Sequence, residues 1–523
     1  MLSFVPLPEQ ERALDLFRQG KTLRVDAYAG TGKTATLRLL ATAAASKGLY
    51  LAFNRSIALE ARQTFPPGVA CNTIHSIAFR NVRRAFRFSE QKLTGALSVN
   101  VLLGAFQIPE TISFRSGLCL SSRSYASILV EATRNFLRSS DITPGAVHVP
   151  RLGALEFVSD PQFADFAQQA GEHVAVLWSN MCSAQSALPL GHDGYLKLWA
   201  ISNPVPQVDY ILIDEAQDLN AVLLGVLRGL KCQMVYVGDP YQQIYEWRGA
   251  INAMEQVAVD DRVLLSQSFR FGPAIASAAT NILRELGARE PVLGSKRLKS
   301  HLARVQPDVI LSRSNLTAMG HVLDALSRNQ RCYLLGGTVA LESLLEDVSR
   351  LKAGTAAVSP ELVGFSSWKD VLAQSVTPEG AHLRSLVNMV VEYGERTMLA
   401  GLRRTERDEP KAQIVCSTAH RAKGREWEYV RVADDFEEAL LRSERPRMEE
   451  STALTTMQSC GFSMSRSHAR RRPSNSRNLC SIASVCTILR ICDWAEKAYG
   501  PSNGYGSPRY TGVRVTLSTS RPE

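Results

Sequence analysis

The segment AYAGTGKT has the residue types and spacing of a phosphate-binding loop. It follows a run of apolar residues and opens a helical pattern, which is the context that such a loop requires. Its glycines let backbone N–H groups close around phosphates, and the N-terminus of the following helix adds positive potential. Lys33 is predicted to reach the β- and γ-phosphates and Thr34 to ligate Mg²⁺. The candidate nucleotide-binding residues are Ala29, Gly30, Thr31, Gly32, Lys33 and Thr34.

One position of this loop departs from the general pattern. Ala27 stands where a glycine is usual, and this weakens the match of the bare pattern. A glycine-rich turn between a strand and a helix is the alternative interpretation. The GKT ending and an acidic segment further along the chain favour the phosphate-binding loop.

That acidic segment is ILIDEAQD, Ile211 to Asp218, which places carboxylates at the end of an apolar run. Asp214 is predicted to hold Mg²⁺ through water, and Glu215 to polarise an attacking water molecule. An acidic strand end alone is common and often structural. Paired with a phosphate-binding loop upstream, it predicts a site that hydrolyses ATP with the help of Mg²⁺.

These motifs must be positioned by a scaffold of alternating strands and helices. Apolar runs alternate with helical patterns in the first half of the chain, as in LRVDAYAG, GLYLAFN, YILIDEA and QMVYVGD. A second group of such runs begins near Leu264 and includes DVILSRS, CYLLGGT, QIVCSTA and YVRVADDF. This alternation is typical of parallel α/β sheets, so the fold class is predicted to be α/β with a P-loop NTPase site.

Two stretches of helical character interrupt these strands, between His75 and Tyr210 and around residues 342–407. The first contains FRNVRRAFRF, which predicts one basic and one apolar helix face. The basic face could follow nucleic-acid phosphates, or it could simply be solvated. Its arginines are Arg80, Arg83, Arg84 and Arg87, and the apolar residues opposite are Phe79, Val82 and Phe86.

Composition indicates a globular protein, with 45% hydrophobic and 21% charged residues among 523. The net charge of +10 is weak evidence for nucleic-acid binding, because residues 451–523 hold ten Arg and Lys against three Asp and Glu. That Ser-, Arg- and Thr-rich tail has no apolar periodicity and is expected to be disordered.

The ten cysteines form no C-x-x-C pair, so no structural zinc site is expected. Cys480, Cys486 and Cys492 are evenly spaced but lack a fourth ligand. No signal peptide and no run of about 20 apolar residues is visible. We therefore expect a cytoplasmic protein without a membrane span.

The sequence DEAQD, followed by GDPYQQIYEWRGA at Gly238 to Ala250, resembles the UvrD/Rep-like superfamily 1 DNA helicases. The motif sequences are most similar to those of the F-box DNA helicase branch and its bacterial relatives. The resemblance extends from about Pro8 to Phe436. The resemblance implies two RecA-like domains with helical insertions. The implied segments are 1–80 with 205–262 for the first domain, 81–204 for its insertion, 263–341 with 408–450 for the incomplete second domain, 342–407 for a small insertion, and 451–523 for the tail.

The resemblance also implies roles around ATP. Gln10 in LPEQ would read adenine, and Phe269 in QSFRF would stack on it. Gln242 would sense the γ-phosphate, and Arg270 would contact that phosphate from the second α/β half. Glu426 in KGREW would couple the nucleotide state to the second half, although a surface ion pair is the alternative for this glutamate.

For nucleic acid, the resemblance implies contacts from FNRSIA, TIHS, YEWR and STAHRAKGREW. Trp247 is the most specific candidate, because an exposed aromatic ring beside an arginine can stack on any base. A core tryptophan is its alternative, and His75 and His420 could equally be core histidines. Gln217 would link the hydrolysis site to the DNA. The candidates are Phe53, Asn54, Thr73, His75, Tyr245, Trp247, Arg248 and His420.

The function that the resemblance implies is an ATP-dependent DNA helicase or translocase, with single-stranded DNA and duplex junctions as partners. Family members move 3′ to 5′ and act in recombination or repair. A non-catalytic remnant that binds ATP and DNA is the alternative from another class. An RNA-directed helicase is a third possibility.

The segment after VADDF departs from the family pattern. A sequence resembling LLYVALTRA, a strand and helix whose arginine completes the ATP site, is expected there, and CGFSMSRSHARRRPSNS stands in its place. Back-translating Phe462 to Ser476 with permitted codons, and reading from the third base, gives LYVALTRAQTALEL. We therefore hypothesise a frameshift between about Arg445 and Ser459, so that the chain as written would bind ATP and hydrolyse it poorly.

Overall fold

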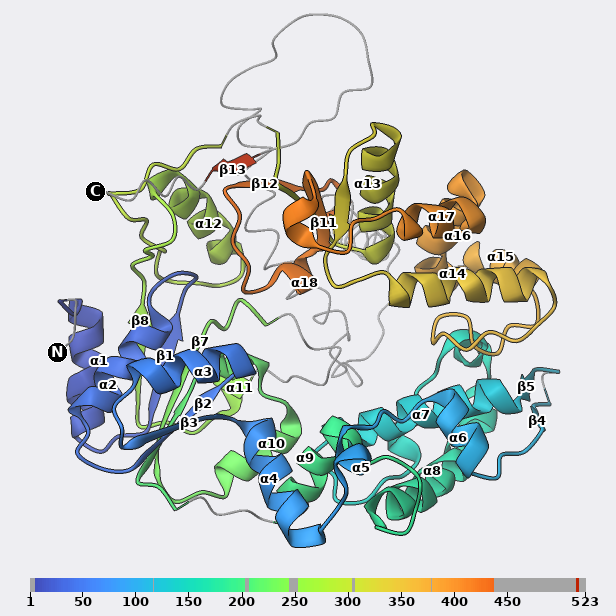
Figure 1. The fold of residues 1–523 in the computed structure, drawn as a ribbon, viewed down its shortest axis with the longest axis horizontal. Coiled ribbons are helices and arrows are strands. Elements are labelled where there is room, and N and C mark those ends of the chain that lie inside the picture. Colours follow the sequence, from blue (N-terminus) through green and yellow to red (C-terminus); the bar gives the residue numbers. More distant parts are fainter. Residues whose placement is uncertain are drawn as a thin grey trace, which may run out of the picture.

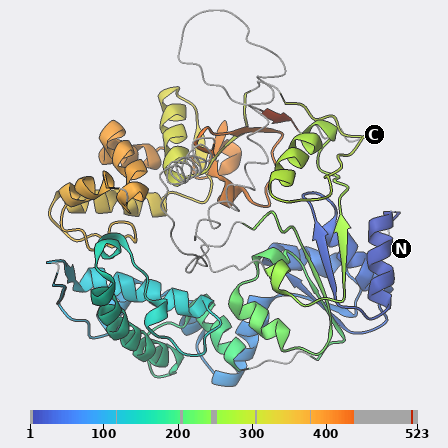
Figure 2. The same cartoon turned by 180° about the vertical axis from the view of Figure 1, so that it is seen from behind.

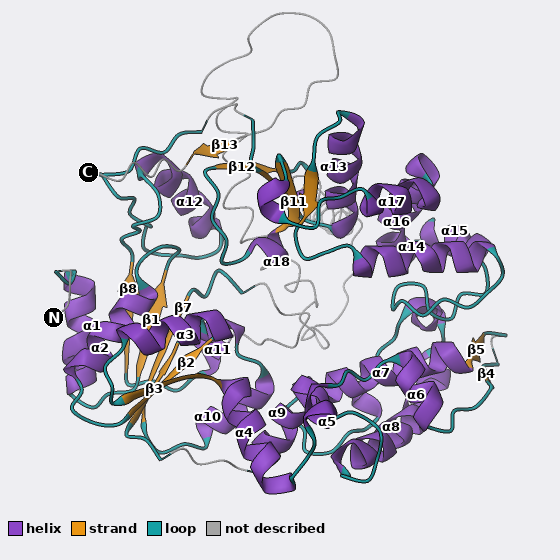
Figure 3. Cartoon of the chain, viewed as in Figure 1, coloured by secondary structure: helices purple, strands orange, loops and turns teal. Residues whose placement is uncertain are grey.

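The computed structural model describes residues 5–115, 117–202, 207–243, 253–302, 306–377 and 379–436, together with the backbone of residues 514–516. Two sheets lie one above the other in Figure 1, and two largely helical regions lie beside each other to their right. The same arrangement is seen from behind in Figure 2, and Figure 3 separates the strands from the helices by colour. Both sheets are built on parallel strands, so the predicted α/β class is confirmed.

The first sheet has six strands in the order β3-β2-β6-β7-β1-β8. Helices cover both faces, since one core cluster joins the sheet to α1, α2 and α3 and another joins it to α10 and α11. Burial on both faces explains the continuous apolar runs of these strands. The elements are α1 (Pro8–Arg18), β1 (Leu23–Ala27), α2 (Lys33–Ala43), β2 (Gly48–Ala52), α3 (Arg55–Thr64), β3 (Val69–Thr73), β6 (Tyr210–Ile213), α10 (Ala221–Arg228), β7 (Gln233–Gly238), α11 (Ala253–Gln256) and β8 (Asp261–Leu265).

Strand β8 shows where the sequence-based division differs from the structure. The second α/β unit was expected to begin at residue 263, which lies inside β8. However, β8 pairs in parallel with β1 over Leu23 to Ala27, so the first sheet extends through Leu265. Helix α12 (Pro273–Glu285) also packs beside Tyr28 and Tyr241 of the first half. The apolar residues of β8 alone do not indicate which of the two sheets this strand joins.

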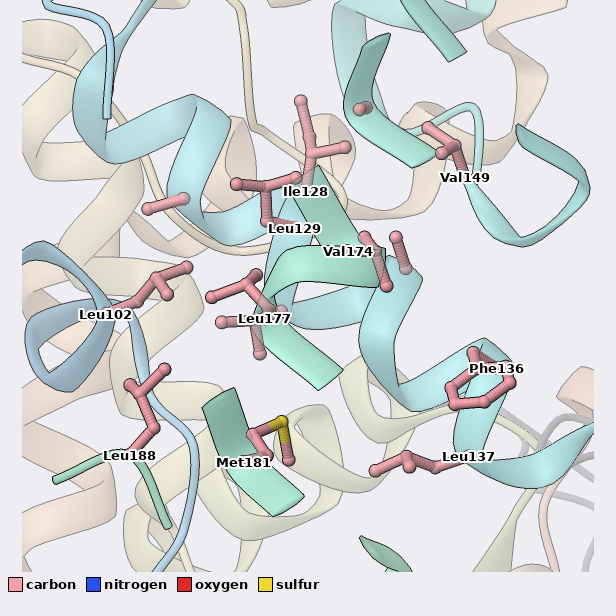
Figure 4. Close-up of a cluster of buried hydrophobic side chains, with 14 of the residues drawn as sticks. Leu102, Ile128, Leu129, Phe136, Leu137, Val149, Val174, Leu177, Met181 and Leu188 are labelled. Carbon is pink, nitrogen blue, oxygen red and sulfur yellow. The ribbon is translucent and has the colours of Figure 1, made fainter. Parts of the chain in front are cut away.

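The segment between β3 and β6 is mainly helical, as its sequence predicts, with one small hairpin. Its interior is a large apolar cluster that includes Leu102, Ile128, Phe136 and Leu177 (Figure 4). The expected boundary at residue 80 falls inside α4. The elements are α4 (Ile74–Phe86), α5 (Glu90–Thr94), α6 (Val99–Ala105), β4 (Thr111–Ser113), β5 (Cys119–Ser121), α7 (Ser122–Arg138), α8 (Asp160–Cys182) and α9 (Gly191–Ile201).

The basic and apolar faces predicted for α4 are present in part. Phe79 and Val82 pack against the apolar cluster. Phe86 is 41% exposed and stacks on Phe88 instead. Arg87 caps the helix in a left-handed conformation, so of the four predicted arginines it alone lies beyond the helix.

The second sheet has the order β10-β11-β9-β12-β13, and its first four strands are parallel. β13 pairs antiparallel with β12, so three residues of the tail expected to be disordered form a strand. Helices α14 to α17 form the second insertion, between β10 and β11. The elements are β9 (Val309–Ser312), α13 (Asn315–Ser327), β10 (Cys332–Leu334), α14 (Val339–Lys352), α15 (Trp368–Ser375), α16 (Arg384–Tyr393), α17 (Glu395–Arg403), β11 (Ile414–Thr418), α18 (Ala419–Ala422), β12 (Tyr429–Val432) and β13 (Arg514–Thr516).

The two helical regions are joined by the loop that connects α14 to α15. The Val363 side chain is fully buried in the apolar cluster of the first helical region, and its carbonyl accepts a hydrogen bond of 3.0 Å from the Ala154 N–H. Gly153 has φ 53°, and a Cβ there would lie 2.1 Å from the Val363 oxygen. Only glycine fits at this position. The second insertion is therefore anchored to the first by packing as well as by the chain.

Within the described residues, no helix is long and apolar enough to cross a membrane. The same residues contain no group of three or more His, Cys, Asp or Glu side chains placed to hold a metal ion. Cys480, Cys486 and Cys492 lie outside the described residues.

Candidate active site

The phosphate-binding loop connects β1 to α2 through two glycines in left-handed conformations. Gly30 has φ 75° and Gly32 has φ 81°, which side chains rarely tolerate. A Cβ on Gly30 would also lie 2.5 Å from the Cβ of Arg270. Ala27 is the last residue of β1. Because this is an ordinary strand position, the departure from glycine at Ala27 does not disturb the loop.

Lys33 and Thr34 at the start of α2 meet the acidic end of β6. The Lys33 ammonium lies 3.3 Å from the Glu215 carboxylate, and both side chains are largely buried. The Thr34 hydroxyl donates a 3.0 Å hydrogen bond to Asp214 Oδ2. Four residues predicted from two distant motifs are thus brought into one site.

Glu215 is held in an unusual backbone conformation at this site. Its φ of 52° lies in the left-handed region, which costs a non-glycine residue on the order of 1–3 kcal/mol. The carboxylate accepts a 2.6 Å hydrogen bond from the Gln217 amide. The Gln217 amide oxygen in turn accepts from the Asp239 N–H at 3.1 Å. Gln217 therefore fixes Glu215 relative to the loop after β7.

The electrostatics of the site separate the two neighbouring carboxyl groups. Burial and the adjacent Glu215 raise the pKa of Asp214, and these effects outweigh its hydrogen bonds from Tyr50 and Thr34. Burial alone would raise the pKa of Glu215, but Lys33 and the Gln217 hydrogen bond outweigh it and lower that pKa. Glu215 is thus held as a carboxylate beside a lysine whose pKa the acidic cluster raises despite burial.

Gln10 and Phe269, the predicted adenine contacts, both lie close to Gly32. A Cβ on Gly32 would be 3.7 Å from Gln10 Nε2 and 3.9 Å from Phe269 Cε2. Gln10 is buried and donates to the Thr36 hydroxyl at 2.9 Å. The Phe269 ring is 54% exposed, while its N–H donates to the Gly30 carbonyl at 2.8 Å. An exposed ring anchored to the loop is available for stacking.

Gln242 and Arg270 both lie at the loop, although Arg270 is not where it was expected. The Gln242 amide donates a 2.6 Å hydrogen bond to Asp239. Arg270 follows β8 of the first sheet, so its backbone belongs beside the phosphate-binding loop and does not come from the second sheet. It reaches the second sheet through an ion pair of 2.7 Å with Glu426, and both side chains are partly exposed.

A contact that the sequence did not predict joins the two halves. Lys423, just after α18, lies 2.5 Å from the Asp218 carboxylate, and the two side chains are 13% and 1% exposed. The same ammonium donates to the Gln242 carbonyl at 3.0 Å. Burial raises the pKa of Asp218 to about 6 even beside this lysine. Lys423 lies in the motif HRAKGREW and Asp218 in the motif DEAQD, but no sequence pattern predicts that the two side chains contact each other.

The candidate nucleic-acid residues of the first half gather at the ends of β2 and β3. These strands are neighbours, with Ala52 opposite Thr73. Phe53 is 47% exposed. Asn54 accepts from the Ile57 N–H at 2.9 Å and Thr73 from the Ser76 N–H at 3.2 Å. Both polar side chains therefore cap helices, α3 and α4.

The remaining candidates have mixed outcomes. The half-buried His75 ring packs edge-on against Tyr195 of α9 at 6.1 Å, and burial lowers its pKa. His420 lies in α18. In the basic face of α4, Arg80 donates to Asn72 and Arg83 lies 3.9 Å from Glu90. Tyr245, Trp247 and Arg248 lie outside the described residues.

Removing the ammonium that bridges the halves gives a first testable consequence. Lys423→Met leaves the buried Asp218 carboxylate without its partner, and breaking a buried pair on one side is strongly unfavourable. We expect single-stranded-DNA-stimulated ATP turnover to fall by about tenfold, because about 1.4 kcal/mol of lost coupling corresponds to that factor. Steady-state ATPase assays on a chain with the reading frame restored measure the change.

Lys411→Met is the matched control, since Lys411 pairs with Asp408 at 2.6 Å on the surface of the same half. Exposed pairs of this kind contribute little, so turnover should stay at the wild-type level. An equal loss in both variants would contradict a specific role for the Lys423 bridge.

Comparisons with known proteins agree with this geometry. The UvrD/REP helicase N-terminal domain family matches residues 198–258, which include β6 and β7. F-box DNA helicase 1 of Gallus gallus is 29% identical over 82% of this chain and 44% of its own length. F-box DNA helicase protein 1 of Schizosaccharomyces pombe is 28% identical over 80% of this chain and 51% of its own length.

A bacterial relative shares a shorter region. The ATP-dependent DNA helicase Rep of Escherichia coli is 31% identical over 21% of this chain and 17% of its own length. The chain spans about half the length of the two F-box relatives. A phosphate-binding loop facing a DEAQD strand end, together with these similarities, supports a UvrD-like helicase.

Proposed function

We propose that this chain is an ATP-dependent DNA helicase or translocase that moves 3′ to 5′ along single-stranded DNA and acts at duplex junctions in recombination or repair. The observation that carries the proposal is the buried Lys423–Asp218 ion pair. It links the second sheet to the same acidic segment that supplies Asp214 and Glu215. Through such a contact, a change in the nucleotide bound at the hydrolysis site can shift the position of the half that contains the second sheet.

In this proposal the two sheets are the cores of two RecA-like domains. The helical regions between β3 and β6 and between β10 and β11 are their insertions. Closing and opening of the cleft between the two domains would move the strand by a small step for each ATP. The family names of the relatives support DNA as the substrate, and the polarity rests on the same likeness.

The residues of the first half would divide the chemistry of hydrolysis among them. Lys33 and the loop N–H groups would bind the β- and γ-phosphates. The Thr34 hydroxyl would ligate Mg²⁺, and the Asp214 carboxylate, 3.0 Å from that hydroxyl, would hold the ion through water. Bound there, Mg²⁺ would neutralise charge on the phosphates.

Glu215 would then accept a proton from the attacking water, since the site keeps it ionised and in place. Gln242 and Arg270 would contact the γ-phosphate, and Gln10 and Phe269 the adenine. Glu426 now pairs with Arg270. It would couple the nucleotide state to the second half by way of that arginine.

For the strand, we propose contacts from Phe53, Asn54, Thr73, Trp247 and neighbouring residues of the same motifs. The neighbouring ends of β2 and β3 support this assignment, because they place two of these motifs side by side. His75 fits the proposal least well, since its ring packs against α9.

The C-terminal segment supports a second proposal about this particular chain. Residues 460–476 stand where the arginine-bearing motif is expected, and one permitted choice of their codons gives that motif in a shifted frame. We propose that a frameshift has impaired catalysis, so that the chain as written is a remnant that binds ATP and DNA. The restored chain would be the active enzyme.

Strand displacement tests the proposed function. With ATP and Mg²⁺, the frame-restored chain should separate a labelled duplex that carries a 3′ single-stranded DNA tail, and leave one with a 5′ tail intact. RNA should stimulate ATP turnover much less than DNA. Lys33→Ala serves as the blank. Displacement from the 5′ tail would overturn the polarity, and stimulation by RNA alone would overturn the substrate.

A further inference from the structure

A tyrosine hydroxyl lies against the carboxylate that we propose to hold Mg²⁺. Tyr50, in the middle of β2, is fully buried, and its ring packs on Phe65 with centroids 4.5 Å apart. Its hydroxyl donates a 2.8 Å hydrogen bond to Asp214 Oδ2. The pair is 164 residues apart in the sequence. Packing in the core requires only the apolar ring at this position. The hydroxyl therefore indicates a role beyond packing.

The strand register accounts for the reach of this side chain. β2 and β6 are parallel neighbours with Tyr50 opposite Leu212. Asp214 is two residues beyond Leu212 and therefore on the same face of the sheet. The Tyr50 ring lies along that face and delivers its hydroxyl to the end of β6. Any slip of β2 against β6 would break this contact.

Three donors fix the Asp214 carboxylate, two from other elements and one from the next residue in the chain. Oδ2 accepts from Tyr50 of β2 and from the Thr34 hydroxyl of α2, and Oδ1 accepts from the Glu215 N–H at 3.0 Å. Thr34 is itself a proposed Mg²⁺ ligand, and its position depends on the loop that binds the nucleotide. Tyr50 is the one of these donors that belongs to the rigid interior of the sheet.

The Tyr50 hydroxyl is the donor in its contact with Asp214, because an ionised carboxylate can only accept. A fixed donor of this kind orients a carboxylate without competing with it for the cation. Groups that orient metal ligands in this way commonly change metal affinity by about 10- to 100-fold when they are removed.

We propose that Tyr50 is a positioning residue for the Mg²⁺ site, which sets the orientation of Asp214 toward Mg²⁺ bound with the nucleotide. The inference rests on the proposed function, because it takes Asp214 as the carboxylate that holds that ion. It predicts that Tyr50 governs the Mg²⁺ requirement of nucleotide binding, and that the affinity for nucleotide without Mg²⁺ does not depend on it.

The test is nucleotide binding without turnover. Binding of a fluorescent ATP analogue to the full chain is measured over a range of Mg²⁺ concentrations and in EDTA. Tyr50→Phe keeps the ring and removes the hydroxyl. In this variant, we expect the Mg²⁺ concentration that gives half of the maximal increase in binding of the ATP analogue to rise by about tenfold. The affinity for the analogue in EDTA should be unchanged.

Tyr210→Phe is the matched control in the adjacent strand. Tyr210 is 1% exposed, and its hydroxyl has no hydrogen-bond partner among the described residues. The same substitution there should leave both measurements at the wild-type values. Thermal unfolding midpoints check that both variants fold. Replacing Tyr50 by 4-aminophenylalanine, which keeps the ring and a donor, should return the Mg²⁺ requirement toward the wild-type value.

The outcomes separate this inference from the function on which it rests. A Mg²⁺ requirement of Tyr50→Phe equal to that of Tyr210→Phe would overturn the positioning role alone. An equal loss of affinity with Mg²⁺ and in EDTA would overturn it too, and would mean that Tyr50 only supports the fold of the loop. If the wild-type chain shows no Mg²⁺ enhancement or no binding at all, the proposed ATP site fails together with the inference.

Discussion

Replacing Glu215 by Gln is expected to lower the DNA-stimulated ATP turnover of the frame-restored chain by about 10²- to 10⁴-fold, the usual contribution of a general base. Glutamine has the same shape but cannot take a proton from water. The backbone at this position is already in the left-handed region, and the substitution adds no bulk there. Nucleotide binding should persist, because Lys33 loses its ion pair with Glu215 but keeps its charge, and the phosphate-binding loop is unchanged.

Two measurements establish this result. Turnover is followed in a steady-state assay, and binding is followed with the fluorescent ATP analogue. Glu172→Gln, an exposed position on α8, is the matched control and should be neutral. If Glu215→Gln keeps turnover near the wild-type rate, another group activates the water and the assignment is wrong.

Much of this site could be predicted because its signals are local. The glycines, Lys33 and Thr34 are adjacent in the sequence, and their chemistry requires adjacency. Asp214 and Glu215 follow an apolar run that had to be a strand. The structure brings these two local signals together across the sheet, as the predicted parallel fold requires.

The contacts that sequence reasoning missed are those without a local pattern. Lys423 and Asp218 are 205 residues apart, and Tyr50 and Asp214 are 164 apart. Only the register of neighbouring strands and the approach of the two halves define such pairs. A tyrosine in the middle of a buried strand was a weak signal, because its ring alone satisfies the apolar pattern.

Short strands were missed for a related reason. β3 and β8 have five residues each, and several of these residues are partly or fully exposed. Their apolar patterns are therefore interrupted. Missing β8 moved the expected boundary of the second unit to residue 263 and placed Arg270 in the wrong half. The order of strands in a sheet depends on contacts between distant segments, which no single run of residues encodes.

Restoring the reading frame is expected to have an effect as large as that of the Glu215 substitution. The shifted reading of residues 462–476 supplies an arginine within LYVALTRAQTALEL, and a group that stabilises charge during phosphoryl transfer is worth on the order of 10²-fold or more. Turnover should rise by that factor in the restored chain. Nucleotide binding should change much less, since the phosphate-binding loop lies in the first half.

The most direct test of this account is ATP hydrolysis with and without single-stranded DNA, measured on the chain as written and on the frame-restored chain, with Lys33→Ala as the blank. The account predicts DNA stimulation in the restored chain alone, at a rate on the order of 10²-fold or more above the chain as written. Equal stimulation in both chains would contradict it, because the arginine motif would then be dispensable.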